Sequence, residues 1–475
     1  MEESVSKRVA QRAQTPSAQT GAHRLSRTER YARGKSLRKA CPRNSHAAWK
    51  PPSDRIDPVA LVLKADKGRI PELLPLRHGR MVVSPFTFYR GAALNMAADL
   101  AATRTTGVRV QCGGDCHLVN FRCFATPERR IIFAINDLDE TLPAPWEWDL
   151  KRLAASLVIA CRDNGLRDAV ANDAVLTCVR SYREHMAEFS RMTPMDLWYF
   201  AIDSEMLISS LHDAQLRRRA IKRLEKERAR NVVEDLFPEI AQASGATPVI
   251  EDRPPMILTE KNLTPRDVQR IIKDAFARYG NSLRASTRVL LDRYELQHAS
   301  HKVVGVGSVG TACWVLLLTD GEGDALVLQM KEARASVLEA YAGKSVFSNH
   351  GRRVENGHRL MQPASDMFLG WTKGELGRHY YVRQLRDVKI KFSVETYGKT
   401  EMTLFADWCG HSLALSHARS GDPAVISGYL GRSDEFDRAL AAFSVAYADQ
   451  NERDYADLKR AIRNGQVKAV SDEPG

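Results

Sequence analysis

Apolar residues recur at helical spacing over much of the chain. Over residues 86–102 this pattern follows Ser84 and Pro85, a pair typical of the start of a helix. The parts of the chain on either side of residues 303–333 are expected to be mainly helical. Further helices are predicted over 148–161, across most of 165–285 and in much of 402–465.

A strand-like pattern occupies the region between these helices. Residues 303–333 alternate apolar runs with two glycine-containing turns, which predicts three strands. A helix over 352–365 and a strand starting at Tyr380 would complete a small lobe of five strands and one helix. The chain is therefore predicted to have an α+β fold.

Positive charge is concentrated at the N-terminus. Residues 1–50 carry twelve Lys or Arg and three Glu, which is most of the formal net charge of +12. Because the segment is also poor in apolar residues, we expect a disordered basic leader over 1–56. Such a leader could make weak contacts with nucleic acid or with an anionic surface. The remaining regions are a helical large lobe over 57–285, a β-rich lobe over 286–392 and helices over 393–475 that complete the large lobe.

The sequence also indicates a compartment. No run approaches the roughly 20 apolar residues of a membrane span, and charges stand where a signal peptide needs apolar residues. The eight cysteines lack the spacing of a disulfide framework. We expect a cytoplasmic protein without a transmembrane segment.

Two acidic motifs carry the candidate chemistry. GGDCHLVNF, residues 113–121, contains Asp115 and Asn120, and the strand-like run IIFAI is followed by Asp137 and Asp139. Phosphoryl transfer uses this set: one carboxylate accepts a proton from the attacking hydroxyl, while an amide oxygen and further carboxylates hold magnesium. The motifs therefore predict a phosphotransfer site.

Other interpretations of these motifs stay open. Asp, Asn and Gly are turn residues, so both stretches could be simple connections between strands. The nearby Cys112, Cys116, His117 and Cys123 raise the possibility of zinc, although their spacing fits no common structural zinc pattern and buried thiols are the usual explanation. Asp149 is interpreted as an acid that favours the N-terminus of its helix.

A glycine-rich turn supplies the second part of the predicted site. Gly305, Gly307, Ser308 and Gly310 form a G-x-G-S-x-G pattern between two predicted strands. No helix follows it, which argues against a dinucleotide-binding turn. Lys331 ends the next strand, and a glycine hairpin over the phosphates followed by a strand lysine is the arrangement of protein kinases.

A basic helix is predicted over residues 216–230, with eight basic and two acidic residues. A solvated face with Lys–Glu pairs is the ordinary interpretation of such a helix. A site for an acidic partner is the alternative.

Long blocks of the chain resemble a bacterial family catalogued as domain of unknown function 2252. The resemblance covers about residues 55–455, and it implies no activity. Cys116 stands where the family more often has alanine. The blocks are SPFTFYRGAA, GGDCHLVNF, NDLDETLPAPWEWDLKRLAAS, VVGVGSVGT, MQPASDMFLGW, YVRQLRD and SGYLG.

GGDCHLVNF and the strand ending at Asp137 are also similar to the catalytic loop and metal-binding aspartate of aminoglycoside and choline kinases. This resemblance implies that Asp115 is the catalytic base, that Asn120 and Asp137 are magnesium ligands, and that Asp139 is a possible second acidic ligand. His117 would be structural, with its side chain bonded to backbone.

The same resemblance suggests partners for Lys331 and for the nucleotide base. In a kinase the helix of the small lobe carries a glutamate that pairs with the strand lysine, for which Glu355 is the candidate and Glu339 the alternative. Gln384 and Leu385, with the preceding Arg383, would form the hinge that contacts adenine.

The order of these parts differs from that of a conventional kinase, because the glycine turn and Lys331 follow the catalytic loop. A circularly permuted, two-lobed kinase-like fold would reconcile them, with the helices after residue 395 packed beside the helix at 86–102. This hypothesis predicts that Lys331 and Asp137 meet across one cleft, well within about 15 Å.

The leading functional prediction is an ATP- and magnesium-dependent phosphotransferase acting on an unknown hydroxyl acceptor, either a small molecule or a protein. A metal-dependent phosphohydrolase using Asp115, His117, Asp137 and Asp139 is one alternative. A non-catalytic kinase-like module that binds nucleic acid or a membrane surface through its leader is another.

Overall fold

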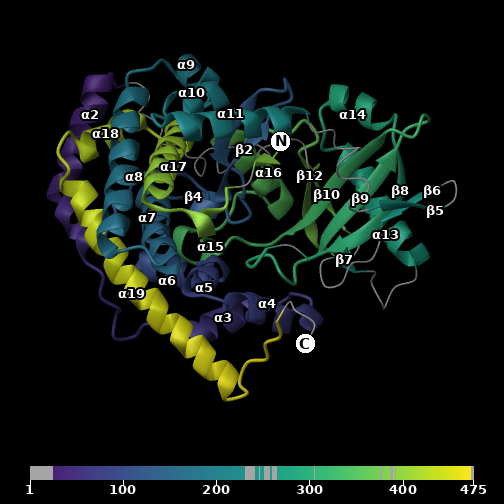
Figure 1. Ribbon diagram of the computed structural model, residues 1–475, viewed down its shortest axis with the longest axis horizontal. Coiled ribbons are helices and arrows are strands. Elements are labelled where there is room, and N and C mark those ends of the chain that lie inside the picture. The colour runs from purple at the N-terminus through teal and green to yellow at the C-terminus, as the bar shows by residue number, and fades with distance from the viewer. Residues whose placement is uncertain are drawn as a thin grey trace, which may run out of the picture.

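A body of helices lies beside a large antiparallel sheet in this α+β protein, and two smaller groups of strands lie between them (Figure 1). The predicted α+β class is confirmed. The computed structural model describes residues 25–229, 241–244, 247–250, 257–258, 265–303, 305–374, 377–385, 389–390 and 392–471.

The helical body is built around α7, which is buried from Trp146 to Cys161. α8 and α17 pack along each other, and α19 crosses α7 and α8. Among the helices that the structure describes, none combines the length and apolar composition needed to cross a bilayer. The body comprises α2 (Arg27–Ser36), α3 (Pro58–Asp66), α4 (Leu74–Met81), α5 (Pro85–Gly91), α6 (Ala93–Ala101), α7 (Trp146–Asp163), α8 (Asp168–Phe189), α9 (Pro194–Tyr199), α10 (Ser204–Ser209), α11 (Ala214–Ala229), α15 (Glu339–Ala342), α17 (Lys399–Ser420), α18 (Pro423–Leu430) and α19 (Glu435–Arg463).

The helix predicted over 86–102 is two helices, α5 and α6. The predicted start is confirmed, because the Ser84 hydroxyl accepts a hydrogen bond from the Thr87 N–H in a capping box. α5 ends at Gly91, whose carbonyl accepts a 2.8 Å hydrogen bond from the Arg77 guanidinium. That carbonyl is therefore satisfied outside the helix, and the chain bends before α6.

The C-terminal helices pack beside α5 and α6, as the permutation hypothesis requires. Tyr447 on α19 donates to Asp99 on α6 at 2.9 Å. Asn451, also on α19, donates to the carbonyl of Pro85 at 3.0 Å. The two ends of the folded region therefore share one surface.

The large sheet is antiparallel, with the described strands in the order β11-β12-β10-β9-β8-β7. Lys331 in β10 lies opposite Cys313 of β9 and Tyr381 of β12. One face of the sheet packs on α13, where Val382 is buried against Tyr279. The elements are β7 (Ile257–Leu258), α13 (Pro265–Gly280), α14 (Ala285–Leu291), β8 (Glu295–Lys302), β9 (Cys313–Thr319), β10 (Ala325–Ala333), α16 (His350–Met361), β11 (Gly370–Lys373) and β12 (His379–Gln384).

The smaller strand groups carry the acidic motifs. β2 and β3 form a hairpin in which Phe121 lies opposite Ile135, and β13 pairs with the other edge of β2. Asn120, just before β2, and Asp137, just after β3, are therefore at the same end of the hairpin. The remaining strands are β1 (Arg109–Cys112), β2 (Phe121–Ala125), β3 (Ile131–Ile135), β4 (Leu142–Pro145) and β13 (Lys389–Ile390), with β5 (Ala241–Ser244) paired to β6 (Thr247–Ile250).

The prediction of a disordered leader over 1–56 is wrong for its second half. α2 packs on α18, and Arg38 donates to the carbonyls of Tyr429 and Gly428 at 2.8 and 2.7 Å. Arg43 pairs with Glu435. The basic side chains of this segment thus find carboxylates and helix-end carbonyls within the protein, which composition alone does not reveal. Residues 1–24 lie outside the described residues.

Candidate active site

The loop from Gly113 to Asn120 is held against α7 by its own backbone. The Asp149 carboxylate, in the first turn of α7, accepts the N–H groups of Gly113 and Gly114 at 2.6 and 3.0 Å. The Ser156 hydroxyl accepts the N–H of Leu118 at 3.2 Å. Asp149 therefore does more than favour a helix terminus, as its position in the sequence suggested: it orders the loop that carries Asp115.

Gly114 has a backbone that favours glycine. Its φ is +79°, and a Cβ at this position would lie 2.4 Å from the carbonyl oxygen of Glu140. The loop and the segment after Asp137 therefore approach each other closely at this point.

Asp115 forms an ion pair with Arg152 of α7. Arg152 donates to one carboxylate oxygen from both Nε, at 2.8 Å, and Nη2. The other oxygen faces His117 Nε2 at 3.8 Å. Burial raises the pKa of Asp115 to about 7, although Arg152 opposes this rise, and the charges of Asp137 and Glu140 add to it.

His117 is neutral, because burial and the neighbouring Arg90 and Arg152 hold its pKa well below the usual value. Its Nδ1 is buried without a hydrogen-bond partner. The side-chain bond to backbone expected for His117 is therefore not formed through this nitrogen, although its backbone N–H donates to the Asp115 carbonyl at 2.9 Å.

Asn120 closes the loop. The side-chain nitrogen of Asn120 donates to the backbone carbonyl of Asp115 at 2.8 Å. The backbone carbonyl of Asn120 accepts the N–H of Asn136 at 2.7 Å. Within the described part of the chain, no group donates to the Asn120 amide oxygen. That oxygen is thus available as a ligand beside Asp137.

Lys331 and the acids after β3 come together from the two sheets. Lys331 Nζ lies 3.9 Å from Asp137 Oδ1 and also pairs with Asp139. The predicted proximity of Lys331 and Asp137 is confirmed. The Lys331 side chain is 4% exposed, whereas those of Asp137 and Asp139 are 41% and 24% exposed. The acids therefore face solvent while the cation lies behind them.

These charges keep Asp137 ionised. Burial alone would raise the pKa of Asp137, but Lys331, Arg383 and Arg122 outweigh it and lower the pKa. Burial alone would likewise lower the pKa of Lys331, yet Asp137 and Asp139 raise it well above its usual value.

Two residues of β12 complete this side of the site. The Tyr381 hydroxyl donates to Asp139 Oδ1 at 2.8 Å. Arg383 donates to the Asn136 carbonyl and to the Gln329 side chain, each at 3.2 Å. Both side chains are therefore fixed toward the acids from the same face of the sheet as Lys331.

The glycine-rich turn lies between two paired strands, as predicted, and these strands are β8 and β9. β8 ends at Lys302, before residue 303, where the first of the three strands was predicted to begin. Gly305 and Gly310 have φ values of +66° and +83°, which favour glycine in this turn. The Gly310 carbonyl accepts the N–H of Ile70 at 2.8 Å. The turn thus rests on the segment that precedes α4.

The turn and the acids share Arg90 as a neighbour. A Cβ on Gly307 would lie 3.2 Å from the Arg90 carbonyl oxygen. Burial lowers the pKa of Arg90, while Asp115 and Asp137 raise it, so its guanidinium lies within electrostatic reach of both acids. The predicted Ser308 lies in the same turn, where its carbonyl accepts the N–H and the hydroxyl of Thr311.

The predicted glutamate partner of Lys331 is wrong. Glu355 pairs with Arg359 one turn along α16, and Glu339 faces His350 at 3.7 Å. Arg353 of α16 contacts this region and donates a 2.7 Å hydrogen bond to the backbone carbonyl of Asp139. The acids after β3 already neutralise Lys331, so no glutamate from α16 is needed there.

The predicted hinge residues make hydrogen bonds within the protein. The N–H of Leu385 donates to the Val327 carbonyl at 2.9 Å, and the N–H of Gln384 donates to the Asp366 carboxylate. Both backbone donors are therefore engaged, and a base in this region would need other donors or acceptors.

The cysteines near the motif do not form the zinc group considered from the sequence. Among the described residues, the compact group of metal-ligand types is Cys112, Asp149 and His417, without Cys116 or Cys123. Asp149 already accepts two backbone N–H groups, and His417 Nδ1 lies 2.9 Å from the Tyr182 hydroxyl. The group is satisfied by hydrogen bonds.

Asp149, Arg152 and Tyr381 were not predicted as parts of the site, and Arg383 was predicted at the adenine hinge and not beside the acids. Asp149 and Arg152 are three residues apart on α7, which also carries Glu147 and Lys151, and all four side chains are buried. Charged residues at buried helical positions need partners, and that signal could have directed attention to them.

Comparison with known proteins gives one match. Searches of curated proteins and of solved structures found none. A family profile described as "uncharacterized protein conserved in bacteria (DUF2252)" matches residues 69–461, which include the acidic loop, Lys331 and the glycine-rich turn. Because the match spans most of the chain, this protein belongs to the DUF2252 family.

Proposed function

We propose that this protein transfers a phosphoryl group from ATP to a hydroxyl acceptor, using magnesium and a circularly permuted, two-lobed kinase-like arrangement. The observation that carries the proposal is the contact of Lys331 with Asp137 and Asp139. A strand lysine behind a glycine turn and a pair of acids beside a loop aspartate are the parts that phosphoryl transfer uses.

The order of elements supports the permuted arrangement. The strands β8, β9 and β10 are followed by the short α15 and then by α16, β11 and β12, and apart from α15 this is the order expected for a nucleotide-binding lobe. The contacts of α19 with α5 and α6 place the C-terminal helices next to the start of the large lobe. If the two ends of the folded region were joined and the chain were cut before the β-rich lobe, the parts would follow in the order of a conventional kinase.

The donor set fits magnesium. Asn120, Asp137 and Asp139 offer amide and carboxylate oxygens, the ligand type that this ion prefers, and the Asp137 side chain is 41% exposed. These three side chains would hold the ion, whose positive charge would offset the charge of the nucleotide phosphates. Lys331 neutralises the same acids in this structure.

The other side chains would act on the substrates. Lys331 would bind the nucleotide phosphates, and the turn with Gly305, Gly307, Ser308 and Gly310 would cover them. Asp115, oriented by Arg152, would accept the proton of the acceptor hydroxyl as the oxygen–phosphorus bond forms. The bond between the γ-phosphorus and the bridging oxygen breaks, so ADP leaves.

A thermal unfolding experiment with nucleotide tests the proposal. ATP with magnesium is expected to raise the unfolding midpoint of the wild type. At a ligand concentration one hundred times Kd, the free energy of unfolding should increase by about 2.7 kcal/mol. Asp137→Ala should lose the part of the rise that depends on magnesium. Glu128→Ala, which removes an exposed acid in the turn between β2 and β3, is the matched control.

The remaining outcomes discriminate between functions. If no nucleotide raises the midpoint of the wild type, the proposal falls. Hydrolysis of a phosphodiester with manganese and without nucleotide would assign the acids to a phosphohydrolase instead. Nucleotide binding without transfer to any acceptor and without ATP hydrolysis would indicate a binding module.

A further inference from the structure

A cavity lies away from the acids, on the other side of β2. Arg122 of β2 lies near Asp137, whose charge raises the pKa of this arginine against the effect of burial. Cys123, the next residue, points to the opposite side of the strand and lines the cavity. The cavity is therefore separated from the proposed phosphotransfer site by the hairpin itself.

The cavity is large enough for a small organic molecule. Its volume is about 240 Å³, above the roughly 150 Å³ of an engineered apolar cavity that binds benzene. Its walls come from β2, α10, α11, α17 and the segment after β13. Elements from three distant parts of the chain thus enclose one space.

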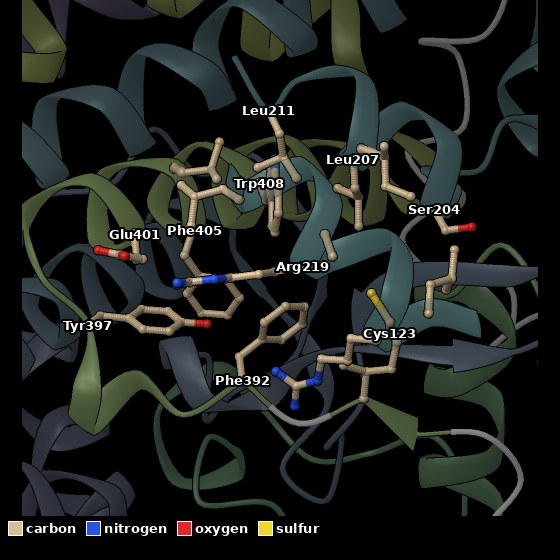
Figure 2. Close-up of a pocket in the computed structure, with 17 residues that line it drawn as sticks. Cys123, Ser204, Leu207, Leu211, Arg219, Phe392, Tyr397, Glu401, Phe405 and Trp408 are labelled. Atoms are coloured by element: carbon tan, nitrogen blue, oxygen red, sulfur yellow. The ribbon is translucent and has the colours of Figure 1, made fainter. Parts of the chain in front are cut away.

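Most of the lining is apolar, and much of it is aromatic. Phe392, Tyr397, Phe405 and Trp408 line the cavity, and Leu207 from α10 lies beside Trp408 (Figure 2). Aromatic walls favour a flat ring, which can stack or meet them edge to face. The body of a matching ligand is therefore aromatic.

The predicted basic helix supplies charge to the cavity. On α11, Leu216, Ala220 and Leu224 line the cavity together with Arg219 and Arg223. These positions follow helical spacing, so one stripe of the helix presents both its apolar side chains and two guanidinium groups. The two arginines are exposed, which places the charge where the cavity meets solvent.

The arginine charge reaches into the cavity. Burial raises the pKa of Cys123 to about 12, and Arg223 opposes that rise. Glu401 lies on the same side of the cavity as Arg219 and Tyr397 (Figure 2). Arg219 and Arg223 bring guanidinium groups to the lining, and a guanidinium group binds a carboxylate through charge-assisted hydrogen bonds.

We propose that this cavity binds a small aromatic monocarboxylate, with its ring against Phe392, Phe405 and Trp408 and its carboxylate at Arg219 and Arg223. The guanidinium group matches a carboxylate in shape as well as in charge. Glu401 disfavours a second negative charge nearby. This site is independent of the phosphotransferase proposal, because it needs none of the acids around Lys331.

Isothermal titration calorimetry of the full chain with 2-naphthoate tests the site, and the uncharged 2-naphthamide is the comparison ligand. We expect saturable binding of naphthoate and weaker binding of the amide. Arg219→Gln combined with Arg223→Gln should weaken naphthoate binding at least about tenfold, since a charge-assisted hydrogen bond is lost, and should leave amide binding unchanged. Arg218→Gln on the same helix is the matched control, because Arg218 does not line the cavity.

Filling the cavity locates the binding. Ala220→Phe should abolish binding of both compounds, and Leu216→Trp provides a second filling variant on the exposed side of the same wall; circular dichroism checks that each is folded. Absence of naphthoate binding by the wild type would overturn the proposal. Unchanged naphthoate binding by the folded filling variants, or by the double arginine variant, would overturn it as well.

Discussion

Lys331 Nζ lies 3.9 Å from Asp137 Oδ1 across the boundary between the large sheet and the β2–β3 hairpin. The same ammonium group pairs with Asp139, and the hydroxyl of Tyr381 donates to Asp139 as well. This contact joins the two groups of strands through charge. Solvent weakens this ion pair, because water reaches the two carboxylates although it hardly reaches the lysine.

Replacing Lys331 with methionine should destabilise the protein and remove nucleotide binding. The two carboxylates would then repel each other without a cation. We expect the free energy of unfolding to fall by about 1–3 kcal/mol, below the roughly 3–5 kcal/mol of a fully buried pair, because the acids are partly exposed. Denaturant unfolding measures this change. Lys373→Met, on the exposed side of β11, is the control, and an equal effect of both variants would contradict the expectation.

Gly114→Ala should lower the free energy of unfolding by more than the left-handed backbone angle alone would. The alanine would adopt a left-handed φ and would also meet the carbonyl oxygen of Glu140 at 2.4 Å. Gly107 has nearly the same φ, +75°, and a Cβ added there would meet no atom within 4 Å. Gly107→Ala should therefore lose only the left-handed penalty of about 1–2 kcal/mol.

The difference between these two alanine variants isolates the close contact. We expect Gly114→Ala to lose about 1 kcal/mol more in denaturant unfolding. It should also lower phosphotransfer more than Gly107→Ala, because Asp115 is the next residue. Equal losses of stability would mean that the loop relaxes around the new methyl group.

Deleting residues 1–50 should destabilise the folded protein. The deletion removes Arg38, which donates to the Tyr429 carbonyl at 2.8 Å, and His46, whose Nε2 lies 2.7 Å from the Tyr429 hydroxyl. It also uncovers α18, against which α2 packs. Thermal unfolding should show a midpoint lowered by several degrees. Deletion of residues 1–24 alone is the comparison, and equal midpoints for the two deletions would refute a structural role for 25–50.

The stability of the protein should fall as pH decreases below about 6.5. His185 and His411 stack with ring centroids 3.5 Å apart. Burial lowers the pKa of His411 to about 3, with a further contribution from His185, and burial lowers the pKa of His185 to about 4. Their neutral forms thus favour the folded state above pH 6.5, and this stability is lost as pH falls through the folded-state pKa values.

Phenylalanine at position 411 should reduce this loss. His411→Phe keeps the aromatic packing against Phe189 and Phe200 but takes up no proton on unfolding. The slope of unfolding free energy against pH between about 4 and 6.5 should therefore be shallower than in the wild type. His212→Phe, which replaces an exposed histidine, is the control. A slope identical to that of the wild type would show that the pair does not titrate as described.

Local sequence patterns were enough to predict several parts of the structure. Ser84 caps α5 because its hydroxyl needs only the N–H three residues on, a contact that neighbouring residues determine. Lys331 near the end of β10 and Asp137 after β3 follow from runs of apolar residues that form buried strands. The break at Gly91 could not be predicted, since it depends on Arg77 of another helix.

The sequence by itself determined the α+β class, most of the helices and strands, and the residue types at the acidic loop, because periodicity and turn chemistry act over a few residues. Only the tertiary structure decided that Arg152 holds Asp115, that Asp149 orders Gly113 and Gly114, and that Glu355 pairs with Arg359 and not with Lys331. Tertiary packing also assembled the cavity beside α11. These contacts depend on which distant elements pack together, and charged side chains take the partners that packing brings within reach.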